Sequence, residues 1–352
     1  MQDDPDNIGN RIHDENIDDS PIVRSNYIHP YEKLTPDIVI NAVESLGYIS
    51  DARMLALNSY ENRVYQVGMQ DGSSIVVKFY RPGRWTLSQI LEEHHFSEEL
   101  SALEIPVIPP LKHAQQSIFE FEDFQLAVFP LFIGRPLELD DLNNLLVMGR
   151  FIGRIHSVGI KSIFTERLEI SIDRFAISSR EFLLENNFIP TELIPAYETL
   201  SKDLIDRIDS WFSDHGAVNK LRIHGDCHAG NVLWKNNTPN FVDFDDTMNG
   251  PAIQDLWMML SGSRDQKQAQ LLELVEGYNE FFSFRVSELS LIESLRTLRI
   301  MNYSAWLARR WSDPAFPRNF PWFNTDRYWS EHILQLREQL SVLDEPPLEI
   351  LL

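Results

Sequence analysis

The sequence predicts an α+β fold of two lobes, a small β-rich amino-terminal lobe with one key helix and a larger, mainly helical carboxy-terminal lobe. Two observations support this prediction. Strand-like apolar runs separated by polar turns extend from about Leu55 to Ile133. From Asp140 onward the apolar residues recur instead at helical spacing, as over Leu145–His156, which is typical of helices with one buried face.

The chain divides at two predicted boundaries. Residues 1–28 are acidic, polar and poor in aromatic residues, so we expect a disordered tail that cannot bury enough apolar surface to fold alone. Residues 29–133 form the predicted amino-terminal lobe, and residues 134–352 form the carboxy-terminal lobe. The segment Leu131–Arg135 would join them as a hinge.

The individual elements follow from local signals. A first helix is predicted over Thr35–Leu46, with Pro36 in its first turn, where proline is favoured. A second helix covers Thr86–Leu103, a proline-rich link follows at Ile105–Leu111, and Phe124–Pro130 is the last strand of the small lobe. The carboxy-terminal lobe is expected to contain long amphipathic helices at 145–156, 195–213, 266–283 and 287–311.

The composition limits the possible partners and the compartment. The formal charge of −22 would repel phosphate groups at long range, which argues against nucleic acid or an anionic membrane as the main partner. No apolar run approaches the roughly 20 residues that a membrane span needs. The first residues also lack the basic and apolar regions of a signal peptide. The single cysteine, Cys227, excludes an intramolecular disulfide, and we expect a cytoplasmic monomer.

One pair of segments carries most of the chemical information. His224–Asn231 (HGDCHAGN) precedes a polar turn, and Phe241–Asp246 (FVDFDD) follows it. Asp226 and Asn231 have the interval found in the kinase catalytic loop, and Asp243 ends a short strand, where a kinase carries its metal-binding aspartate. Phosphoryl transfer from ATP requires a carboxylate that accepts a hydroxyl proton and oxygen ligands for Mg²⁺. We therefore predict Asp226 and Asp243 as catalytic residues, and Asn231 and Asp243 as Mg²⁺ ligands.

The amino-terminal half supplies candidate nucleotide-binding residues. Lys78 lies within an apolar strand and is predicted to contact the α- and β-phosphates of ATP. Glu93 shares a helical face with Phe96 and Leu100, so we expect its carboxylate to face inward and to pair with Lys78. Glu92 is the competing candidate, but its neighbouring position directs it elsewhere.

The loop before Lys78 lacks the Gly-x-Gly-x-x-Gly sequence of protein kinases. Residues 57–67 (LNSYENRVYQV) occupy the strand–turn–strand interval instead. Turn N–H groups and the Ser59 hydroxyl could still hold the phosphates, because backbone donors do most of this work. Ser59 is therefore a predicted nucleotide-binding residue, although the substitution disfavours an ordinary eukaryotic-type kinase.

Some of these residues allow other interpretations. His224, Asp226 and His228 alternate, so on an extended segment they would share a face and could bind Zn²⁺, although no further Cys or His completes the set. Cys227 beside His228 could be a thiol nucleophile, but a small buried side chain that supports the loop is favoured. Lys78 alone would more often be a strand lysine with a solvated head. The Asp–Asn–Asp set downstream favours a functional lysine.

Two more positions have structural interpretations. Asp255 is expected to anchor the catalytic loop through hydrogen bonds rather than to take part in the chemistry. Residues Trp306–Trp311, with Arg309 and Arg310, are expected to form a core-facing stripe of a helix, and lining of a substrate groove is the alternative.

Taken together, the motifs resemble those of the stress response kinase A family, within the aminoglycoside phosphotransferase/choline kinase superfamily of the protein-kinase-like fold. The glycine-free loop and the carboxy-terminal motif narrow the resemblance from superfamily to family. It extends from about residue 30 to the carboxy terminus and rests on Leu57–Tyr65 (LNSYENRVY), Val76–Trp85 (VVKFYRPGRW), Ile90–His94 (ILEEH), His224–Trp234 (HGDCHAGNVLW), Phe241–Asp246 (FVDFDD), Gly250–Met258 (GPAIQDLWM) and Asp313–Trp322 (DPAFPRNFPW).

This resemblance implies a bilobal cytoplasmic kinase that uses ATP and Mg²⁺ to phosphorylate Ser or Thr on proteins, itself included. Carried over by position, Asp226 would be the proton acceptor, Asn231 and Asp243 the Mg²⁺ ligands, and Ser59 a nucleotide-loop residue. The alternative is a small-molecule kinase with an amino alcohol, aminoglycoside or sugar acceptor. A third interpretation, an inactive nucleotide-binding scaffold, is supported only by the glycine-free loop.

Overall fold

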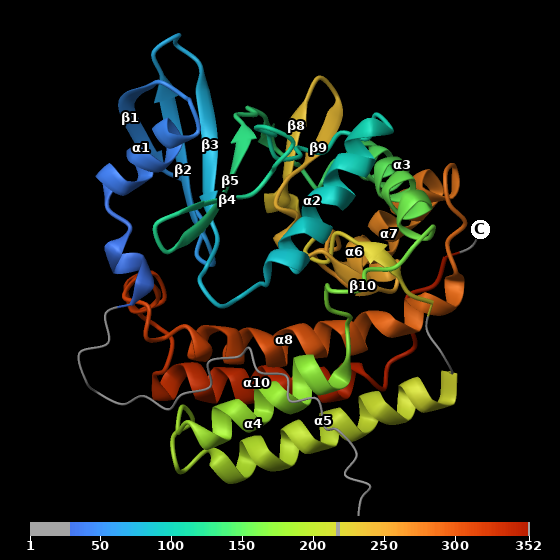
Figure 1. The fold of residues 1–352 in the computed structure, drawn as a ribbon. Helices are drawn as coiled ribbons and strands as arrows, with labels where there is room; N and C mark the ends of the chain where they lie inside the picture. Colours follow the sequence, from blue (N-terminus) through green and yellow to red (C-terminus); the bar gives the residue numbers. More distant parts are fainter. Residues whose placement is uncertain (1–28, 216–218, 351–352) are drawn as a thin grey trace, which may run out of the picture.

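The computed structural model describes residues 29–215 and 219–350 (Figure 1), so the predicted tail over residues 1–28 lies outside the described part. An antiparallel sheet with the strand order β1-β2-β3-β5-β4 forms the amino-terminal region. Its strands are β1 (Ser50–Ala56), β2 (Arg63–Met69), β3 (Ser74–Phe79), β4 (Phe119–Phe121) and β5 (Phe124–Pro130). Lys78 on β3 lies opposite Val64 on β2 and Ala127 on β5, so it occupies the middle of the sheet.

Helix α1 (Pro36–Ser45) packs against this sheet, after a short 3-10 turn at Pro30–Lys33. The Thr35 side chain accepts a hydrogen bond from the Ile38 N–H and so caps the helix, which is a common role for threonine. The fully buried Val39 and Val43 share one hydrophobic cluster with the sheet residues. The predicted first helix is therefore confirmed.

Helix α2 (Leu87–Ala102) connects the sheet to the rest of the molecule. Thr86 and Gln89 form a capping box at its start. Ile90, in its first turns, packs in a cluster with residues of the sheet. Phe96 and Leu100, on the same face farther along, lie in the core of the carboxy-terminal region. Packing therefore fixes the helix at both ends. It also fixes the direction in which its buried side chains point.

The proline-rich link after α2 also joins the two regions. Val107 forms an isolated parallel bridge with Phe241, and the Phe241 N–H donates to the Pro106 carbonyl oxygen over 2.9 Å. Beyond β5, the short strand β6 (Arg135–Pro136) pairs with β8 (Val232–Lys235). The predicted hinge therefore leads into a small sheet of the carboxy-terminal region.

The carboxy-terminal region consists of two helical parts (Figure 1). The first holds the small strands and the helices around them, namely α3 (Leu142–Gly159), β7 (Leu221–Ile223), β8, β9 (Thr238–Phe241), β10 (Met248–Gly250), α6 (Ile253–Trp257) and α7 (Arg264–Asn279). Helices α3 and α7 approach closely at glycines. A Cβ at Gly149 would lie 2.0 Å from the Leu274 carbonyl oxygen, so no larger residue fits there.

The second part is a layer of helices below the first in Figure 1. Its members are the π-helical turn Asp173–Ile177, α4 (Ser178–Glu185), α5 (Ile194–His215), the 3-10 turn Val286–Leu291, α8 (Ile292–Arg309), α9 (Ala315–Asn319) and α10 (Asp326–Val342). Apart from the 3-10 turn, whose Leu289 and Leu291 pack in the core of the first part, they share a separate hydrophobic cluster that includes the fully buried Trp329 and Tyr197. Helix α8 runs beneath the amino-terminal sheet and reaches toward the loop between β1 and β2.

The predicted α+β fold of two lobes is confirmed, with differences at several helix ends. The predicted helix 266–283 ends at Asn279, because the Asn279 side chain accepts the Phe284 N–H and closes a turn. The predicted helix 287–311 begins only at Ile292, since residues 286–291 form a 3-10 turn whose Glu288 accepts the Ile253 N–H. Helices α4 and α10 had not been predicted. None of the helices in the described ranges is both long and apolar enough to cross a bilayer.

Candidate active site

Lys78 lies at the centre of a cluster of carboxylates. Its ammonium group is 2.9 Å from Asp245 Oδ1, 3.3 Å from Asp243 Oδ1 and 3.6 Å from Glu93 Oε1. Burial alone would lower the pKa of Lys78, but these carboxylates outweigh it and raise the pKa well above its usual value. Lys78 is therefore a fixed positive charge inside this cluster of carboxylates.

The two neighbouring glutamates of α2 have different roles. Glu93 is buried beside Lys78, and burial raises its pKa to about 7. Glu92 points to the other side, where its carboxylate accepts the backbone N–H groups of Thr165, Glu166 and Arg167 over 2.8–3.0 Å. The prediction that Glu93 pairs with Lys78 is confirmed. Glu92 attaches α2 to the carboxy-terminal region, a role that the sequence had not indicated.

Hydrogen bonds to the Asp255 carboxylate hold the loop that carries His224 and Asp226. The Asp255 carboxylate accepts the N–H groups of His224 (2.8 Å) and Gly225 (2.9 Å) and lies 3.0 Å from His156 Nε2. The predicted anchoring role of Asp255 is therefore confirmed. Gly225 has a φ of +83°, and a Cβ there would lie 2.2 Å from the Asp246 carbonyl oxygen. Only glycine allows this loop to approach the Asp243 loop so closely.

Asp226 is partly exposed and contacts an amide, an imidazole and an arginine. Asn231 Nδ2 donates to its Oδ2 (3.3 Å), His228 Nε2 lies 3.4 Å from the same oxygen, and Arg299 Nη1 of α8 lies 2.8 Å from Oδ1. Burial would raise the pKa of Asp226, but the His228 hydrogen bond and the Arg299 charge hold the pKa below its usual range. Asp226 is thus ionised at neutral pH, as a hydrogen-bond acceptor for a hydroxyl must be.

Asn231 and Asp243 lie on two segments that a backbone hydrogen bond joins. The Val242 N–H donates to the Asn231 carbonyl oxygen over 3.0 Å, which joins the two segments next to Asp243. Because Asn231 donates its Nδ2 to Asp226, its amide oxygen is directed away from that carboxylate. The Asp243 side chain is 50% exposed, and its backbone adopts the left-handed conformation, which is uncommon for residues other than glycine. Two hard oxygen groups with solvent access are a set that Mg²⁺ accepts.

Asp245 and Arg84 complete the cluster, and neither had been predicted. Asp245 is buried; it accepts the Asn62 side-chain amide over 3.0 Å and forms an ion pair with Arg84. Arg84 reaches Asp246 as well, over 2.5 Å. The sequence offered only a weak signal, the Asp–Asp pair that ends FVDFDD. The 3-10 turn Phe244–Asp246 decides which of these carboxylates faces Lys78.

Ser59 lies on the loop between β1 and β2 and is half-buried. The neighbouring Glu61, Asn62 and Arg63 are tied to distant parts of the chain by their side chains. The loop is therefore fixed in place without glycine.

The alternative chemistries find little support in the geometry. Cys227 is buried, and burial raises the pKa of its thiol well above the usual value, so the thiol is not activated as a nucleophile. His224 is buried and its Nε2 lies 3.0 Å from the Val242 carbonyl oxygen, whereas His228 is 40% exposed and turns toward Asp226. Among the described residues, no group of three or more His, Cys, Asp or Glu side chains is arranged to hold a metal ion.

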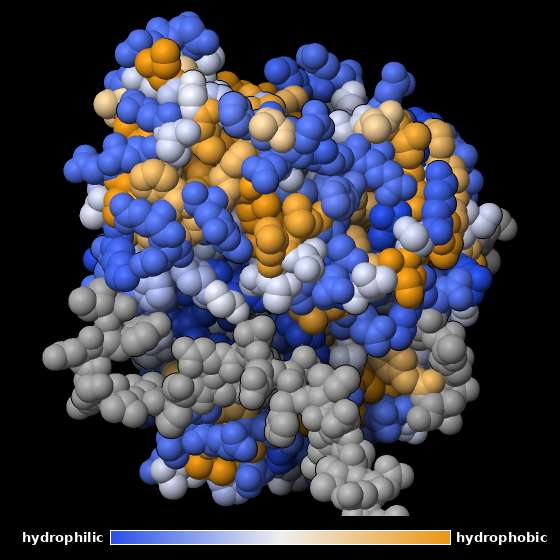
Figure 2. Space-filling view, viewed as in Figure 1, coloured by the Kyte–Doolittle hydropathy of each residue, from blue (hydrophilic) through white to orange (hydrophobic). Residues whose placement is uncertain are grey.

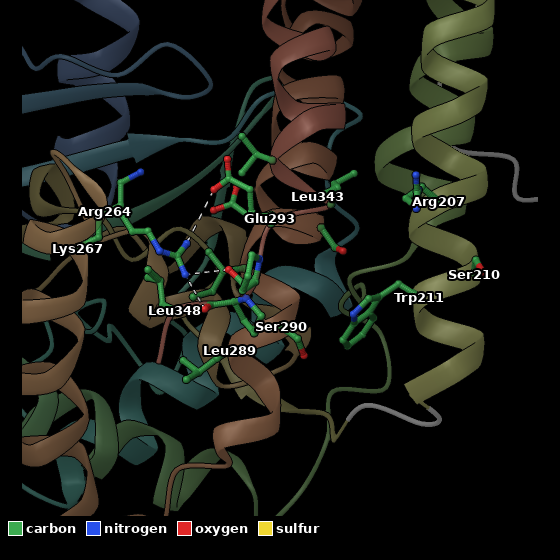
Figure 3. A pocket seen from close by; sticks show the side chains of 16 residues that line it. Arg207, Ser210, Trp211, Arg264, Lys267, Leu289, Ser290, Glu293, Leu343 and Leu348 are labelled. Atoms are coloured by element: carbon green, nitrogen blue, oxygen red, sulfur yellow. Dashed lines mark hydrogen bonds and ion pairs between the residues drawn. The ribbon is translucent and has the colours of Figure 1, made fainter. Parts of the chain in front are cut away.

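A hollow of about 420 Å³ lies apart from this cluster, between α5, α7, α8 and the carboxy-terminal segment (Figure 3). Arg264 spans it and donates to the carbonyl oxygens of Pro346 (2.9 Å) and Pro347 (2.7 Å). None of the predicted site residues lines it, so we do not assign it to the chemistry.

The comparisons with known proteins agree with this arrangement. The family model described as "Phosphotransferase enzyme family" matches residues 54–289. The chain is 43% identical over 326 residues to stress response kinase A of Escherichia coli O157:H7, covering 93% of this chain and 98% of the relative. It is 41% identical to the serine/threonine protein kinase RdoA of Salmonella typhimurium (strain LT2), covering 91% and 97% of the two chains.

Solved structures extend the likeness to the fold. The amicoumacin kinase hAmiN, solved with AMP-PNP and Ca²⁺, superposes with a TM-score of 0.69 at 19% identity, over 89% of this chain and 94% of that one. At this identity the likeness concerns the fold alone. The relatives found by sequence have a much higher identity to this chain, and the match covers nearly their whole length. The chain belongs to the phosphotransferase enzyme family and, within it, to the family of stress response kinase A.

Proposed function

We propose that this chain is an ATP- and Mg²⁺-dependent kinase that phosphorylates serine and threonine residues of proteins, including its own, in the stress response for which its relatives are named. The observation that carries the proposal is the arrangement of a buried Lys78–Glu93 pair, the exposed Asp243 and the ionised Asp226 around one site. An inactive nucleotide-binding scaffold would not need an anchored, ionised Asp226.

The proposed reaction assigns one task to each group. Lys78, oriented by Glu93, holds the α- and β-phosphates of ATP. Asp226 orients the acceptor hydroxyl and takes its proton as the hydroxyl oxygen bonds to the γ-phosphorus. The bond from that phosphorus to the β–γ bridging oxygen breaks, and ADP leaves with this oxygen. Because the transition state spreads charge over oxygens, positioning and electrostatics supply most of the catalysis.

The divalent ion would be held by Asp243 and Asn231. When bound, Mg²⁺ neutralises charge on the β- and γ-phosphate oxygens. The half-exposed Asp243 carboxylate and the Asn231 amide oxygen fit this ion, since Mg²⁺ in such sites keeps several waters and few protein ligands. Asn231 also donates to Asp226, and so it would fix the distance between the ion and the proton acceptor.

The surroundings of Asp226 favour a protein acceptor over a cationic small molecule. Arg299, with its side chain 46% exposed, places a positive charge 2.8 Å from the carboxylate that must meet the acceptor hydroxyl. An amino alcohol or aminoglycoside carries ammonium groups close to its hydroxyls, and Arg299 would repel them. A serine or threonine on an extended segment carries no such charge of its own.

The test compares wild type with Asp226→Asn. Each is incubated with labelled ATP, Mg²⁺, a generic protein acceptor and a panel of amino alcohols, aminoglycosides and sugars. We expect label on protein serine or threonine, and a loss of about 10²-fold or more in turnover by Asp226→Asn with nearly normal ATP affinity. If only a small alcohol became labelled, the chain would be a small-molecule kinase and not a protein kinase. Normal turnover by a folded Asp226→Asn protein would remove the assigned proton acceptor.

A further inference from the structure

The loop between β1 and β2 is attached to the carboxy-terminal half by three consecutive side chains. Glu61, Asn62 and Arg63 each contact a different segment, and their contact residues are 183 to 250 positions away in the sequence. Figure 2 shows the molecule from the same side as Figure 1, with hydrophilic (blue) and hydrophobic (orange) residues mixed over its upper part. A glycine-rich loop would have no side chains for such contacts.

Glu61 is the centre of this attachment. Its carboxylate, 12% exposed, accepts the Trp306 indole N–H over 2.6 Å and forms ion pairs with Arg310 Nε (2.5 Å) and Arg81 Nε (2.8 Å). Burial would raise the pKa of Glu61, but the charges of Arg310, Arg84 and Arg81 lower it to about 2. Trp306 lies in the last turn of α8, and Arg310 is the residue that caps its carboxy-terminal end, so one carboxylate joins the loop to that end of the helix.

Arg63 makes the second attachment. Its Nη2 reaches both carboxylate oxygens of Asp313, over 2.8 and 2.9 Å, and Arg81 Nη2 contacts the same carboxylate over 2.7 Å. The Asp313 side chain is only 2% exposed, so the pair is shielded from water. This contact joins the two motifs LNSYENRVY and DPAFPRNFPW, which lie far apart in the chain.

Asn62 makes the third attachment, and it leads directly into the site. Its side chain is buried; it donates to Asp245 Oδ2 (3.0 Å) and accepts the Arg81 N–H (3.1 Å). Asp245 in turn is 2.9 Å from Lys78. The loop, the Asp243 loop and the central lysine are therefore parts of one network of ion pairs and hydrogen bonds.

We propose that Glu61, together with Trp306 and Arg310 of α8, is a positioning residue that holds the nucleotide loop closed over the ATP phosphates. This inference rests on the proposed function, because it takes the loop to be the phosphate-binding element. A flexible glycine loop must be ordered when nucleotide binds, and that ordering weakens binding. Here the side-chain contacts of Glu61, Asn62 and Arg63 build the order into the protein, so the loop is held in one conformation before ATP arrives.

The sharpest test is Trp306→Phe, which removes the hydrogen bond to Glu61 and keeps an aromatic ring among Tyr303, Phe316 and Phe320. Trp311→Phe on the same stretch of chain is the matched control, since Trp311 packs on Phe323, which in turn contacts Tyr328 and Trp329 of α10.

Affinities for ATP and for adenosine are measured by calorimetry, and the KM for ATP by kinetics. We expect Trp306→Phe to weaken ATP binding about tenfold and adenosine binding less than about twofold. Trp311→Phe should leave both unchanged. Because adenosine lacks the phosphates, the comparison separates the contribution of the phosphates to the affinity from that of the rest of the nucleotide. An equal loss for both ligands would show a general loosening of the two lobes, and unchanged ATP affinity would show that the attachment does not position the loop; either result overturns the proposal.

A second variant, Glu61→Gln, checks that Trp306 acts through Glu61. In the Glu61→Gln background, Trp306→Phe should change ATP affinity by less than about twofold, because the shared contact is already weakened. If the two substitutions instead weakened ATP binding independently, so that their fold-changes multiplied, Trp306 would not act through Glu61. A wild-type protein that binds no ATP would remove the proposed function itself, whereas a wild type that binds ATP and variants that bind equally well would remove only the positioning role.

Discussion

The acid stability of this protein should depend on Glu61. The pKa of Glu61 falls from 4.5 to about 2 in the folded protein. A carboxyl group with a lowered folded pKa contributes stability that is fully present above its unfolded pKa and is lost as the pH falls through the folded pKa. At about 1.4 kcal/mol per pKa unit, the ionised Glu61 contributes about 3 kcal/mol to the free energy of unfolding at pH 7.

Glu61→Gln imitates the protonated side chain and should lose this contribution. Urea unfolding followed by circular dichroism gives the free energy of unfolding of both proteins at several pH values. We expect a difference of about 3 kcal/mol at pH 7 and only about 1.5 kcal/mol at pH 3, where much of the wild-type advantage has gone. Taking the difference cancels other titrating groups, such as Glu93, whose raised pKa acts in the opposite direction.

The control is Glu138→Gln, at an exposed ion pair with Arg135, which should cost less than about 1 kcal/mol at every pH. A Glu61→Gln difference that stays constant from pH 7 to pH 3 would refute the reasoning. It would mean that packing, and not the charge among Arg81, Arg84 and Arg310, determines the cost.

Three shorter predictions concern the site. Asp243→Asn should keep the fold and metal-free nucleotide affinity but lower Mg²⁺-dependent turnover by orders of magnitude, since one anionic ligand is lost; steady-state kinetics measures this. Arg299→Gln should move the acidic limb of the pH profile of kcat/KM to higher pH, because the Arg299 charge lowers the pKa of Asp226. Cys227 should resist alkylation by iodoacetamide at pH 8 until the protein unfolds, because burial raises the pKa of its thiol.

Each of these has a contradicting outcome. A folded Asp243→Asn protein with normal turnover would remove the metal ligand. An unchanged pH profile in Arg299→Gln would show that Arg299 does not act on Asp226, whereas improved use of amino alcohols by the same variant would support its role against cationic acceptors. Rapid labelling of Cys227 in the native protein would show that the catalytic loop opens readily.

The parts of the site that could be predicted from the sequence depend on local patterns. Glu93 could be assigned to Lys78 because it shares a helical face with Phe96 and Leu100, and those two residues are buried in the core. Helix α2 could be placed because its capping residues stand at its start. The anchoring role of Asp255 followed from its position in a motif and is borne out by its hydrogen bonds to the N–H groups of His224 and Gly225.

The rest depends on contacts between distant segments. No local sequence pattern around Glu61 or Asp313 indicates which residue it contacts. Their contacts become evident only in the structure, where α8 ends beside the loop. Asp245 lies only two positions after Asp243, and it is the 3-10 turn Phe244–Asp246 that directs its side chain toward Lys78. Trp306 had been expected mainly to face the core; it is partly buried, but its indole N–H reaches the loop.

Phosphorylation of the protein by itself tests the central claim most directly. Pure wild type and Asp226→Asn are incubated with ATP and Mg²⁺ at several protein concentrations, and intact mass spectrometry with site mapping follows the product. We predict phosphoserine or phosphothreonine on wild type, formed at a rate per molecule that rises with protein concentration, and almost none on Asp226→Asn. A wild-type protein that gains no phosphate while it consumes ATP to phosphorylate an added amino alcohol or sugar would contradict the account.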